Sequence, residues 1–297
     1  MDRQWQGNTD GGNFGQQALI IMFKLLSIRL LYMVTALVVP FYMLFSPKGY
    51  ISIYQYFRTQ FGMSPAKSFL WTYKNHFRFG QVVLDRFAVF AGKKSLFEVE
   101  MSGNEHFEQH LESKKGFVIV ASHVGNFEIA GYFLSQNKKK INIIIYDGET
   151  ETVRKNRSKF LNNNNIELIP VKKDMSHLFA ASLALQSGEV VGMPADRLFE
   201  STKNVECKFL NGRADFPVGA FALSVAFEVD VLAVFCVKIS AKKYKITVAP
   251  LCTGEQNVCK TKAEKINNLI SGYIKELEQI VRQRPEQWFN FYRFWKQ

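Results

Sequence analysis

A histidine and a carboxylate stand five residues apart at the end of a short apolar run. The run, Phe117–Ala121, is rich in β-branched residues and predicts a strand that is buried on both faces. His123 follows it, and Gly125 and Asn126 favour a turn that opens a helix. Glu128 then falls in the first helical turn, where negative charge is favoured. A histidine at the carboxyl end of a strand, close to a carboxylate, can act as a general base, so the segment predicts proton-transfer chemistry.

A second pair of polar residues follows another predicted strand. Asp196 and Arg197 follow the predicted strand Glu189–Met193, at the carboxyl edge of the sheet where α/β proteins assemble their sites. The guanidinium of Arg197 can bind a phosphate through two parallel hydrogen bonds. A local ion pair in a loop is the alternative interpretation.

Motifs of several other enzyme classes are absent from the sequence. There is no Gly-x-Ser-x-Gly turn, no G-x-G-x-x-G fingerprint and no Walker A loop. His106 and His110 stand four residues apart, but no third ligand accompanies them. We therefore predict no serine nucleophile, no metal and no resident cofactor.

Four ordered blocks resemble the glycerolipid and lysophospholipid acyltransferases, and most closely the bacterial branch that includes the late acyltransferases of lipid A synthesis. The blocks are His123-Val-Gly-Asn-Phe-Glu128, Met193-Pro-Ala-Asp196-Arg197, the stretch from Phe209 to Gly219, and the stretch from Arg284 to Phe294. The resemblance implies transfer of an acyl group from a thioester of acyl carrier protein (acyl-ACP) or coenzyme A (acyl-CoA) to a lipid. It also implies that His123 is the base and that Glu128 hydrogen-bonds the other ring nitrogen. The residues that it implies for substrate binding are Asp196, Arg197, Arg154 or Arg157, Gly212, Arg213 and Gly219.

Acyl transfer from a thioester requires a base, which His123 and Glu128 in the turn can provide. A thioester is already activated, so the acceptor can attack it directly once a base removes the acceptor's proton. General base catalysis of this kind typically contributes about 10²–10⁴-fold. For Gly212 and Gly219 the alternative is a purely conformational role in turns, and Arg293 either reaches the site or anchors the C-terminus.

The N-terminal part of the chain changes from polar to apolar. Residues 1–17 form a polar, glycine-rich leader, and residues 18–46 are strongly apolar. The stretch from Leu30 to Phe45, roughly 16 residues or ~24 Å of helix, has no charge but is shorter than the ~30 Å hydrocarbon core of a bilayer. We expect a membrane-associating helix that either crosses the bilayer or lies in its interface, with a buried core helix as the alternative.

The remaining residues, 47–297, predict one acyltransferase domain. Aromatic and basic residues alternate in a helical cap over about 47–95, and strands then alternate with helices over about 96–297. The class is therefore α/β, with a mixed, largely parallel sheet flanked by helices. Predicted strands are Phe97–Met101, Phe117–Ala121, Ile141–Tyr146, Ile166–Pro170, Glu189–Met193, Val231–Ser240 and Lys245–Ala249; predicted helices are Glu128–Gln136, His177–Gln186, Gly219–Phe227 and Thr261–Arg282.

Composition limits the partners. The net charge of +12 favours anionic lipid headgroups or the acidic acyl carrier protein. Nucleic acid is a rival partner, but no nucleic-acid module is recognisable. The 4 cysteines form no C-x-x-C pair, which fits a reducing compartment. We expect a membrane protein at the cytoplasmic face of a bacterial inner membrane.

The acceptor stays open at this stage. A lipid A precursor, an aminolipid, a lysophospholipid and a polyene or pigment lipid all fit the motifs. A non-catalytic lipid-binding protein of the same fold is the rival from another class. The sequence leaves open the acyl chain length, the choice between ester and amide, and the oligomeric state.

Overall fold

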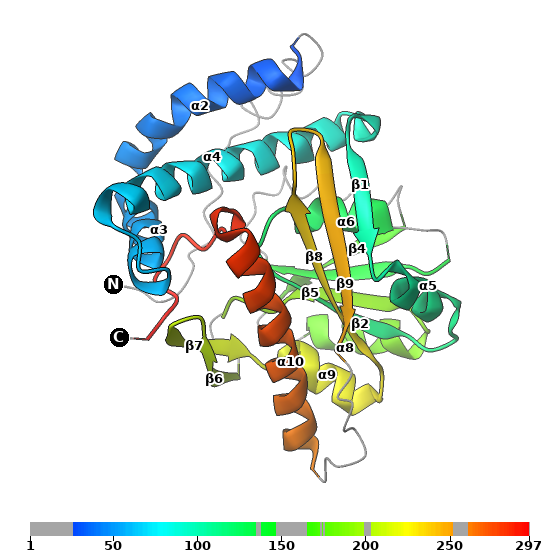
Figure 1. The fold of residues 1–297 in the computed structure, drawn as a ribbon. Coiled ribbons are helices and arrows are strands. Elements are labelled where there is room, and N and C mark those ends of the chain that lie inside the picture. The colour runs from blue at the N-terminus through cyan, green and yellow to red at the C-terminus, as the bar shows by residue number, and fades with distance from the viewer. Residues whose placement is uncertain are drawn as a thin grey trace.

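A seven-stranded sheet forms the centre of the protein (Figure 1). The computed structural model describes residues 26–134, 138–146, 165–172, 174, 176–198, 203–251 and 261–296. Neighbouring strands pair in parallel, except that β8 and β9 are antiparallel. In order across the sheet they are β1 (Glu98–Ser102), β9 (Lys243–Pro250), β8 (Val231–Lys238), β2 (Phe117–Ala121), β5 (Val190–Pro194), β3 (Ile141–Tyr146) and β4 (Ile166–Val171). The predicted α/β class with a mixed, largely parallel sheet is confirmed.

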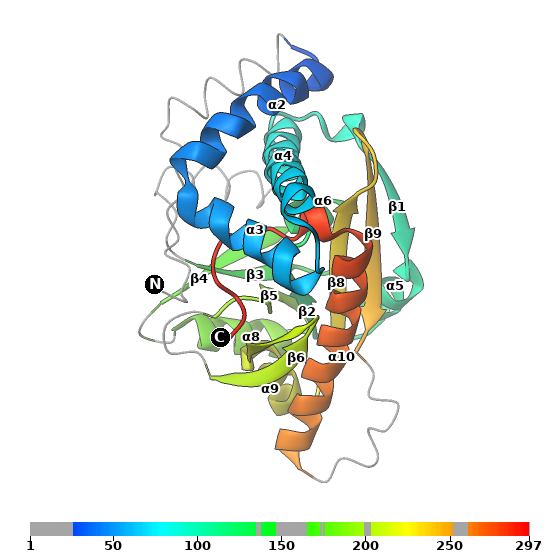
Figure 2. The ribbon, with the colours of Figure 1, turned by 60° about the vertical axis from the view of Figure 1, so that its left-hand side comes forward.

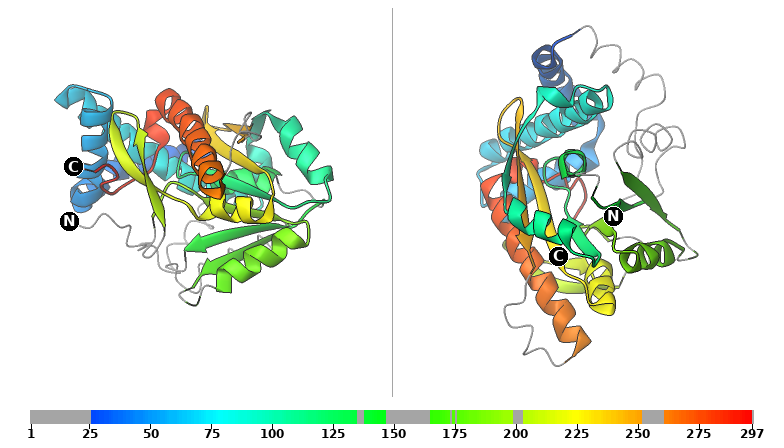
Figure 3. Two further views of the ribbon diagram at one scale, coloured as in Figure 1. Left: turned by 90° about the horizontal axis from the view of Figure 1, so that it is seen from below. Right: turned by 90° about the vertical axis from the view of Figure 1, so that its right-hand side faces the viewer.

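Two hydrophobic cores lie on the two faces of this sheet, because successive side chains of a strand point to opposite sides. On β2, Val118 and Val120 belong to one core and Phe117 and Ile119 to the other. The first core includes residues of α3 (Pro47–Gln60), α8 (Ser176–Gln186), α9 (Gly219–Phe227) and α10 (Lys262–Gln283). The second includes residues of α2 (Ile28–Phe45), α4 (Pro65–Phe90), α5 (Asn104–Glu112) and α6 (Phe127–Leu134). Figure 3 shows these helices around the sheet from two further sides.

A β-hairpin outside the main sheet was not predicted. Strands β6 (Asn204–Phe209) and β7 (Gly212–Pro217) pair with each other in antiparallel fashion and form a separate two-stranded sheet. Charged residues interrupt both strands, so neither shows the apolar run that marks the central strands. Leu210, in the connecting turn, has a positive φ of 53°. Apolar residues rarely adopt this conformation, so the sequence does not indicate a turn at this position.

The N-terminal apolar segment contains helix α2, which runs beside α4 (Figures 1 and 2). By length and composition alone, α2 could cross a membrane, with a mean hydropathy of 1.9. Only 28% of its residues are buried inside the protein. Ser27 caps its start, since the Ser27 side chain accepts a hydrogen bond from the backbone N–H of Leu30.

A fully buried ion pair ties α2 and α4 to the sheet. The carboxylate of Asp85 on α4 is paired with the ammonium of Lys238 on β8, and neither side chain is exposed. The hydroxyls of Tyr32 on α2 and Tyr244 on β9 both donate to this carboxylate. Lys238 Nζ donates further to the carbonyl of Ala241 at 2.9 Å. Each member of the cluster therefore has a partner, which a buried charge requires.

Breaking this cluster on one side should destabilise the fold strongly. We expect Asp85→Asn to cost about 3–5 kcal/mol, because it leaves the Lys238 charge buried and uncompensated. The measurement is the shift of the melting temperature in detergent. A double variant, Asp85→Asn with Lys238→Met, should recover much of the loss.

The exposed pair between Arg282 and Glu278 on α10 is the matched control. Its Nη2–Oε1 distance is 2.7 Å and its side chains are 49% and 28% exposed, so Glu278→Gln should cost only about 0.5 kcal/mol or less. Equal shifts for Asp85→Asn and Glu278→Gln would contradict a special role of the buried pair.

Candidate active site

The turn after β2 is shaped by a glycine. Gly125 has a positive φ of 62°, and a Cβ atom at this position would lie 2.0 Å from the carbonyl oxygen of Cys236 on β8. Only glycine fits so close an approach. The next residue, Asn126, starts α6: its side-chain Oδ1 accepts from the backbone N–H of Ile129 at 3.1 Å. His123 is therefore held between the end of a buried strand and a capped helix.

The C-terminal segment fixes this turn from the other side. The carbonyl of Gln287 accepts from the backbone N–H of Gly125 at 2.8 Å, and Phe289 N–H donates to the carbonyl of His123 at 2.9 Å. The Gln287 side chain bonds both backbone groups of Lys238, at 2.7 Å each. The last part of the chain thus bridges β8 and the histidine turn.

Strand register brings Asp196 to His123. Strands β2 and β5 are parallel, with Ala121 opposite Pro194, so His123 and Asp196 each lie two residues beyond a matched pair. Asp196 Oδ1 is 2.8 Å from His123 Nδ1, and Oδ2 accepts from the backbone N–H of His123, also at 2.8 Å. The indole N–H of Trp288 approaches Oδ2 at 3.4 Å. Three donors therefore converge on one carboxylate that has no exposure to solvent.

This geometry corrects the predicted contact between His123 and Glu128. We expected Glu128 to hold the second ring nitrogen of His123, but Asp196 occupies that place. Glu128 Oε1 instead lies 3.0 Å from Nη1 of Arg86 on α4. Its first-turn position on α6 is as predicted. Glu128 in the first turn of α6 meets Arg86 of α4, whereas Asp196 follows the end of β5, which lies beside the end of β2.

Burial and charge set the protonation states. Burial lowers the pKa of His123, and the nearby charge of Arg197 lowers it further; Asp196 and Glu128 act in the opposite direction and offset only part of the shift. Burial alone would raise the pKa of Asp196, but the charge and hydrogen bonds of His123, helped by Arg197, hold it below its ordinary value. At neutral pH the site therefore combines a neutral imidazole with an ionised carboxylate.

The arrangement has the form of a general base with an orienting carboxylate. An ionised carboxylate at Nδ1 holds the proton on that nitrogen, which leaves Nε2 with its lone pair. No hydrogen-bond partner of Nε2 occurs among the residues that the structure describes, and 18% of the His123 side chain is exposed. Nε2 can therefore accept a proton from a molecule that approaches the turn.

Arg197 is buried beside this pair. It is 7% exposed, and its Nη2 donates to the carbonyl of Phe289 at 2.8 Å. The guanidinium thus connects the end of β5 to the C-terminal segment. Its predicted contact with a substrate phosphate stays a prediction.

The remaining predicted residues lie in other surroundings. Gly212 packs under Trp295, since an added Cβ would come within 2.4 Å of Trp295 Cδ1. Arg213 is exposed and pairs with Glu206 in the hairpin, at 2.8 Å. Gly219 begins α9, with open space where a Cβ would stand. Arg154 and Arg157 lie outside the described residues.

Three contributors to the site were not predicted as such from the sequence. Arg86 meets Glu128 across 42 residues of chain, and no local pattern signals that contact. Trp288 and Phe289 lie in the last of the four sequence blocks, but that block gave no role for either. Their backbone and ring contacts depend on how the C-terminus folds back onto β2.

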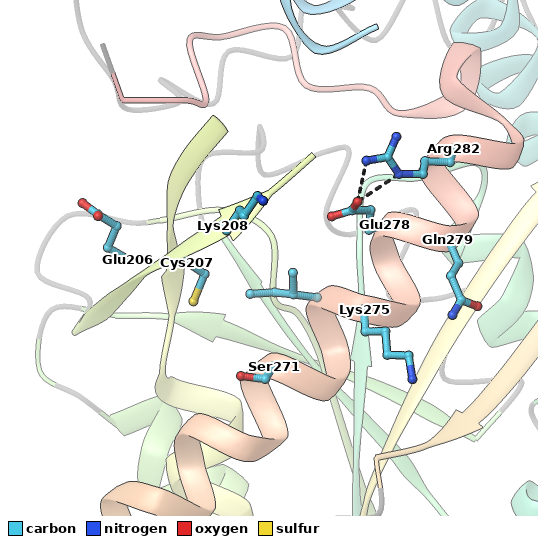
Figure 4. A pocket seen from close by; sticks show the side chains of 9 residues that line it. Glu206, Cys207, Lys208, Ser271, Lys275, Glu278, Gln279 and Arg282 are labelled. Carbon is cyan, nitrogen blue, oxygen red and sulfur yellow. Dashed lines mark hydrogen bonds and ion pairs between the residues drawn. The ribbon is translucent and has the colours of Figure 1, made fainter. Parts of the chain in front are cut away.

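A cleft of about 650 Å³ lies between β6 and α10 (Figure 4). Lys208, Lys275 and Arg282 contribute positive charge to its lining, and Glu206 and Glu278 contribute negative charge. None of its lining residues belongs to the histidine cluster. The cleft and the candidate active site are therefore separate features.

Comparisons with known proteins identify the family of this chain. The family model of bacterial lipid A biosynthesis acyltransferases matches residues 75–297, a range that contains His123, Asp196 and the C-terminal segment. None of the curated proteins matches the chain. Among solved structures, the chain is similar to the 1-acyl-sn-glycerophosphate acyltransferase PlsC from Thermotoga maritima. That match has 14% identity and a TM-score of 0.41, and it covers 84% of this chain and 97% of the other.

The protonation of His123 can be measured directly. We expect NMR titration of ¹⁵N-labelled histidines to give His123 a pKa below the ordinary 6.5, with the proton of the neutral ring on Nδ1. Asp196→Asn should lower that pKa further, because it removes a negative charge that stabilises the imidazolium. The His123→Ala spectrum assigns the resonance. A pKa above 6.5 for His123 in the wild-type protein would contradict the expectation that burial is the largest influence on it.

Proposed function

We propose that this chain moves a fatty acyl group from an acyl thioester to a hydroxyl or amine of a lipid. The premise is that the chain belongs to the family of bacterial lipid A biosynthesis acyltransferases. The observation that carries the proposal is the buried Asp196 carboxylate at Nδ1 of a part-exposed histidine, within the region that the family model covers. The family name supports the acyl transfer, and the histidine pair supports a base-catalysed route.

The proposed reaction needs one base and no covalent enzyme intermediate. The acceptor hydroxyl or amine attacks the thioester carbonyl while His123 Nε2 takes its proton. Asp196 keeps the ring oriented and stabilises the imidazolium that forms. The tetrahedral adduct then expels the thiolate, which recovers the proton from the imidazolium. The products are an ester or amide and a free thiol.

Glu128 has a supporting role in this proposal. Its charge raises the pKa of His123 and so favours the imidazolium, while Arg86 holds the Glu128 carboxylate at 3.0 Å. The substrate contacts of Arg197, Arg213, Gly212 and Gly219 remain part of the proposal, as do those of Arg154 and Arg157. No resident cofactor or metal is required, since the acyl thioester is a co-substrate.

The acceptor and donor are proposed by class. A lipid A precursor is the leading acceptor, because the family takes its name from that pathway. An aminolipid, a lysophospholipid and a polyene or pigment lipid are the alternatives. The net charge of +12 favours acyl carrier protein over coenzyme A as the carrier of the acyl group, since that protein is acidic. The exposed apolar residues of α2 support association with a membrane. The proposed location is the cytoplasmic face of the bacterial inner membrane.

Lipid mass spectrometry of three strains tests the function. We expect one acyl-sized mass difference to be present in wild type, absent in the deletion, and not restored by a gene carrying His123→Ala. The shifted species identifies the acceptor. Equal rescue by the wild-type and His123→Ala genes would favour the non-catalytic lipid-binding alternative.

Kinetics of purified variants test which carboxylate serves the base. We expect Asp196→Asn to lower kcat by about 10³–10⁴-fold, because an amide at Nδ1 permits the wrong tautomer of His123. Glu128→Gln should lower kcat by less than about 10²-fold, since it removes a charge but no ring contact. Unchanged melting temperatures are the control for folding. A larger loss from Glu128→Gln than from Asp196→Asn would assign the orienting role to Glu128.

A further inference from the structure

Helix α2 presents an apolar stripe to solvent along its whole length. Every third or fourth residue on this side is a large exposed hydrophobic side chain, and the stripe has no charged residue. Its members are Leu30, Met33, Val34, Leu37, Val38, Phe41, Leu44 and Phe45. Ile51 on α3 and Phe69 and Leu70 on α4 add exposed apolar side chains on the neighbouring helices. So large an apolar surface is unusual for a protein surrounded by water.

The opposite side of α2 is attached to α4 at successive levels. Near the start, the hydroxyl of Tyr32 donates to the carboxylate of Asp85 on α4. In the middle, Thr35 packs directly on Gly80, where an added Cβ would lie 2.6 Å from its methyl group.

The attachment continues towards the end of α2. The hydroxyl of Tyr73 donates to the carbonyl of Ala36 at 3.0 Å. The rings of Tyr42 and His76 lie 6.1 Å apart. The two helices therefore run antiparallel and in contact over most of the length of α2 (Figure 1).

Basic residues stand at both ends of the stripe. Arg29 is exposed at its start, and Lys48 is exposed just beyond its end. A surface of anionic headgroups complements this distribution, because it offers negative charge at both ends of a helix lying parallel to it.

We propose that α2 lies in the plane of one membrane leaflet, with the stripe from Leu30 to Phe45 in the lipid, and does not cross the bilayer. This proposal rests on the membrane association of the proposed function and specifies its geometry. A crossing α2 would carry α4 with it, because the two helices are joined at every level. Lys74, Arg78 and Arg86 on α4 would then enter the hydrocarbon core, where charges are costly.

The buried cluster around Asp85 fixes this orientation relative to the sheet. The hydroxyl of Tyr32 donates to the Asp85 carboxylate, which also pairs with Lys238 of β8 and accepts from Tyr244 of β9. The helix therefore cannot rotate about its axis to expose its inner side without leaving buried polar groups unpaired. The stripe keeps one direction, away from the sheet and towards the lipid.

Depth-dependent quenching distinguishes the two orientations. Single cysteines replace Met33, Leu37, Phe41 or Phe45 in a chain carrying Cys207→Ser, Cys252→Ser and Cys259→Ser, with the buried Cys236 retained. Each is labelled with an environment-sensitive dye in vesicles of phosphatidylethanolamine and phosphatidylglycerol that contain lipids brominated at defined depths. We expect all four positions to report the same shallow depth.

Other depth patterns would overturn the proposal. A maximum depth at Leu37 with shallower positions towards both ends indicates a crossing helix. Absence of quenching at all four positions indicates that the stripe faces protein, for example a second copy of the chain. Because the readout needs no acyl transfer, it stands whether or not His123→Ala abolishes activity.

Partition into the same vesicles gives an independent test with a matched control. Leu37→Glu and Phe41→Glu should each lower the partition coefficient by about tenfold or more, since each removes a buried apolar side chain from lipid. Phe179→Glu on α8 alters a side chain that is 78% exposed, comparable with 72% for Leu37 and 62% for Phe41. It should leave partition unchanged. If Phe179→Glu lowered the partition coefficient as much as Leu37→Glu, the proposal that α2 is the surface in contact with lipid would be wrong.

Discussion

The carboxylate of Asp196 is the interaction on which the candidate site depends. It is fully buried and remains ionised because three donors meet it: the backbone N–H and ring Nδ1 of His123, and the indole N–H of Trp288. These donors come from the end of β2 and from the C-terminal segment, while the carboxylate follows β5. A single charge therefore joins three parts of the chain that are far apart in sequence. The charge orients the imidazole, and the same bonds fix the turn that carries it.

Helix α4 connects this site to the outer helical layer. Two adjacent residues on it serve different clusters: Asp85 accepts from Tyr32 on α2 and pairs with Lys238 on β8, and Arg86 pairs with Glu128 at the start of α6. The backbone of Lys238 in turn bonds the side chain of Gln287, whose carbonyl holds the histidine turn through Gly125. A chain of hydrogen bonds and one ion pair therefore links α2 and α4 to the turn that carries His123.

The central strands could be predicted from the sequence because their signal is local. Buried parallel strands are short apolar runs, and Phe117–Ala121 and Ile141–Tyr146 have the predicted bounds. Asp196 was predicted as a site residue for the same reason, since it follows such a run. Its contact with His123 was not predicted, because it depends on β5 lying beside β2 in one register. Glu128 was the nearer carboxylate in sequence, but strand order, which no local pattern encodes, made Asp196 the nearer one in space.

The buried pair of Asp85 and Lys238 explains why α2 has one orientation rather than several. Apolar packing alone would hold α2 on α4 with comparable free energy, since a buried ion pair contributes little net stability relative to well-packed hydrophobic residues. Apolar contacts tolerate sliding and rotation, however, because they have no preferred direction. Hydrogen bonds from Tyr32 and Tyr244 to one buried carboxylate do have a direction, and any displacement of α2 leaves charged or polar groups unpaired. The cluster therefore contributes mainly geometry. It sets the angle between the apolar stripe of α2 and the sheet, and with it the direction of the stripe relative to the end of β2 that carries His123.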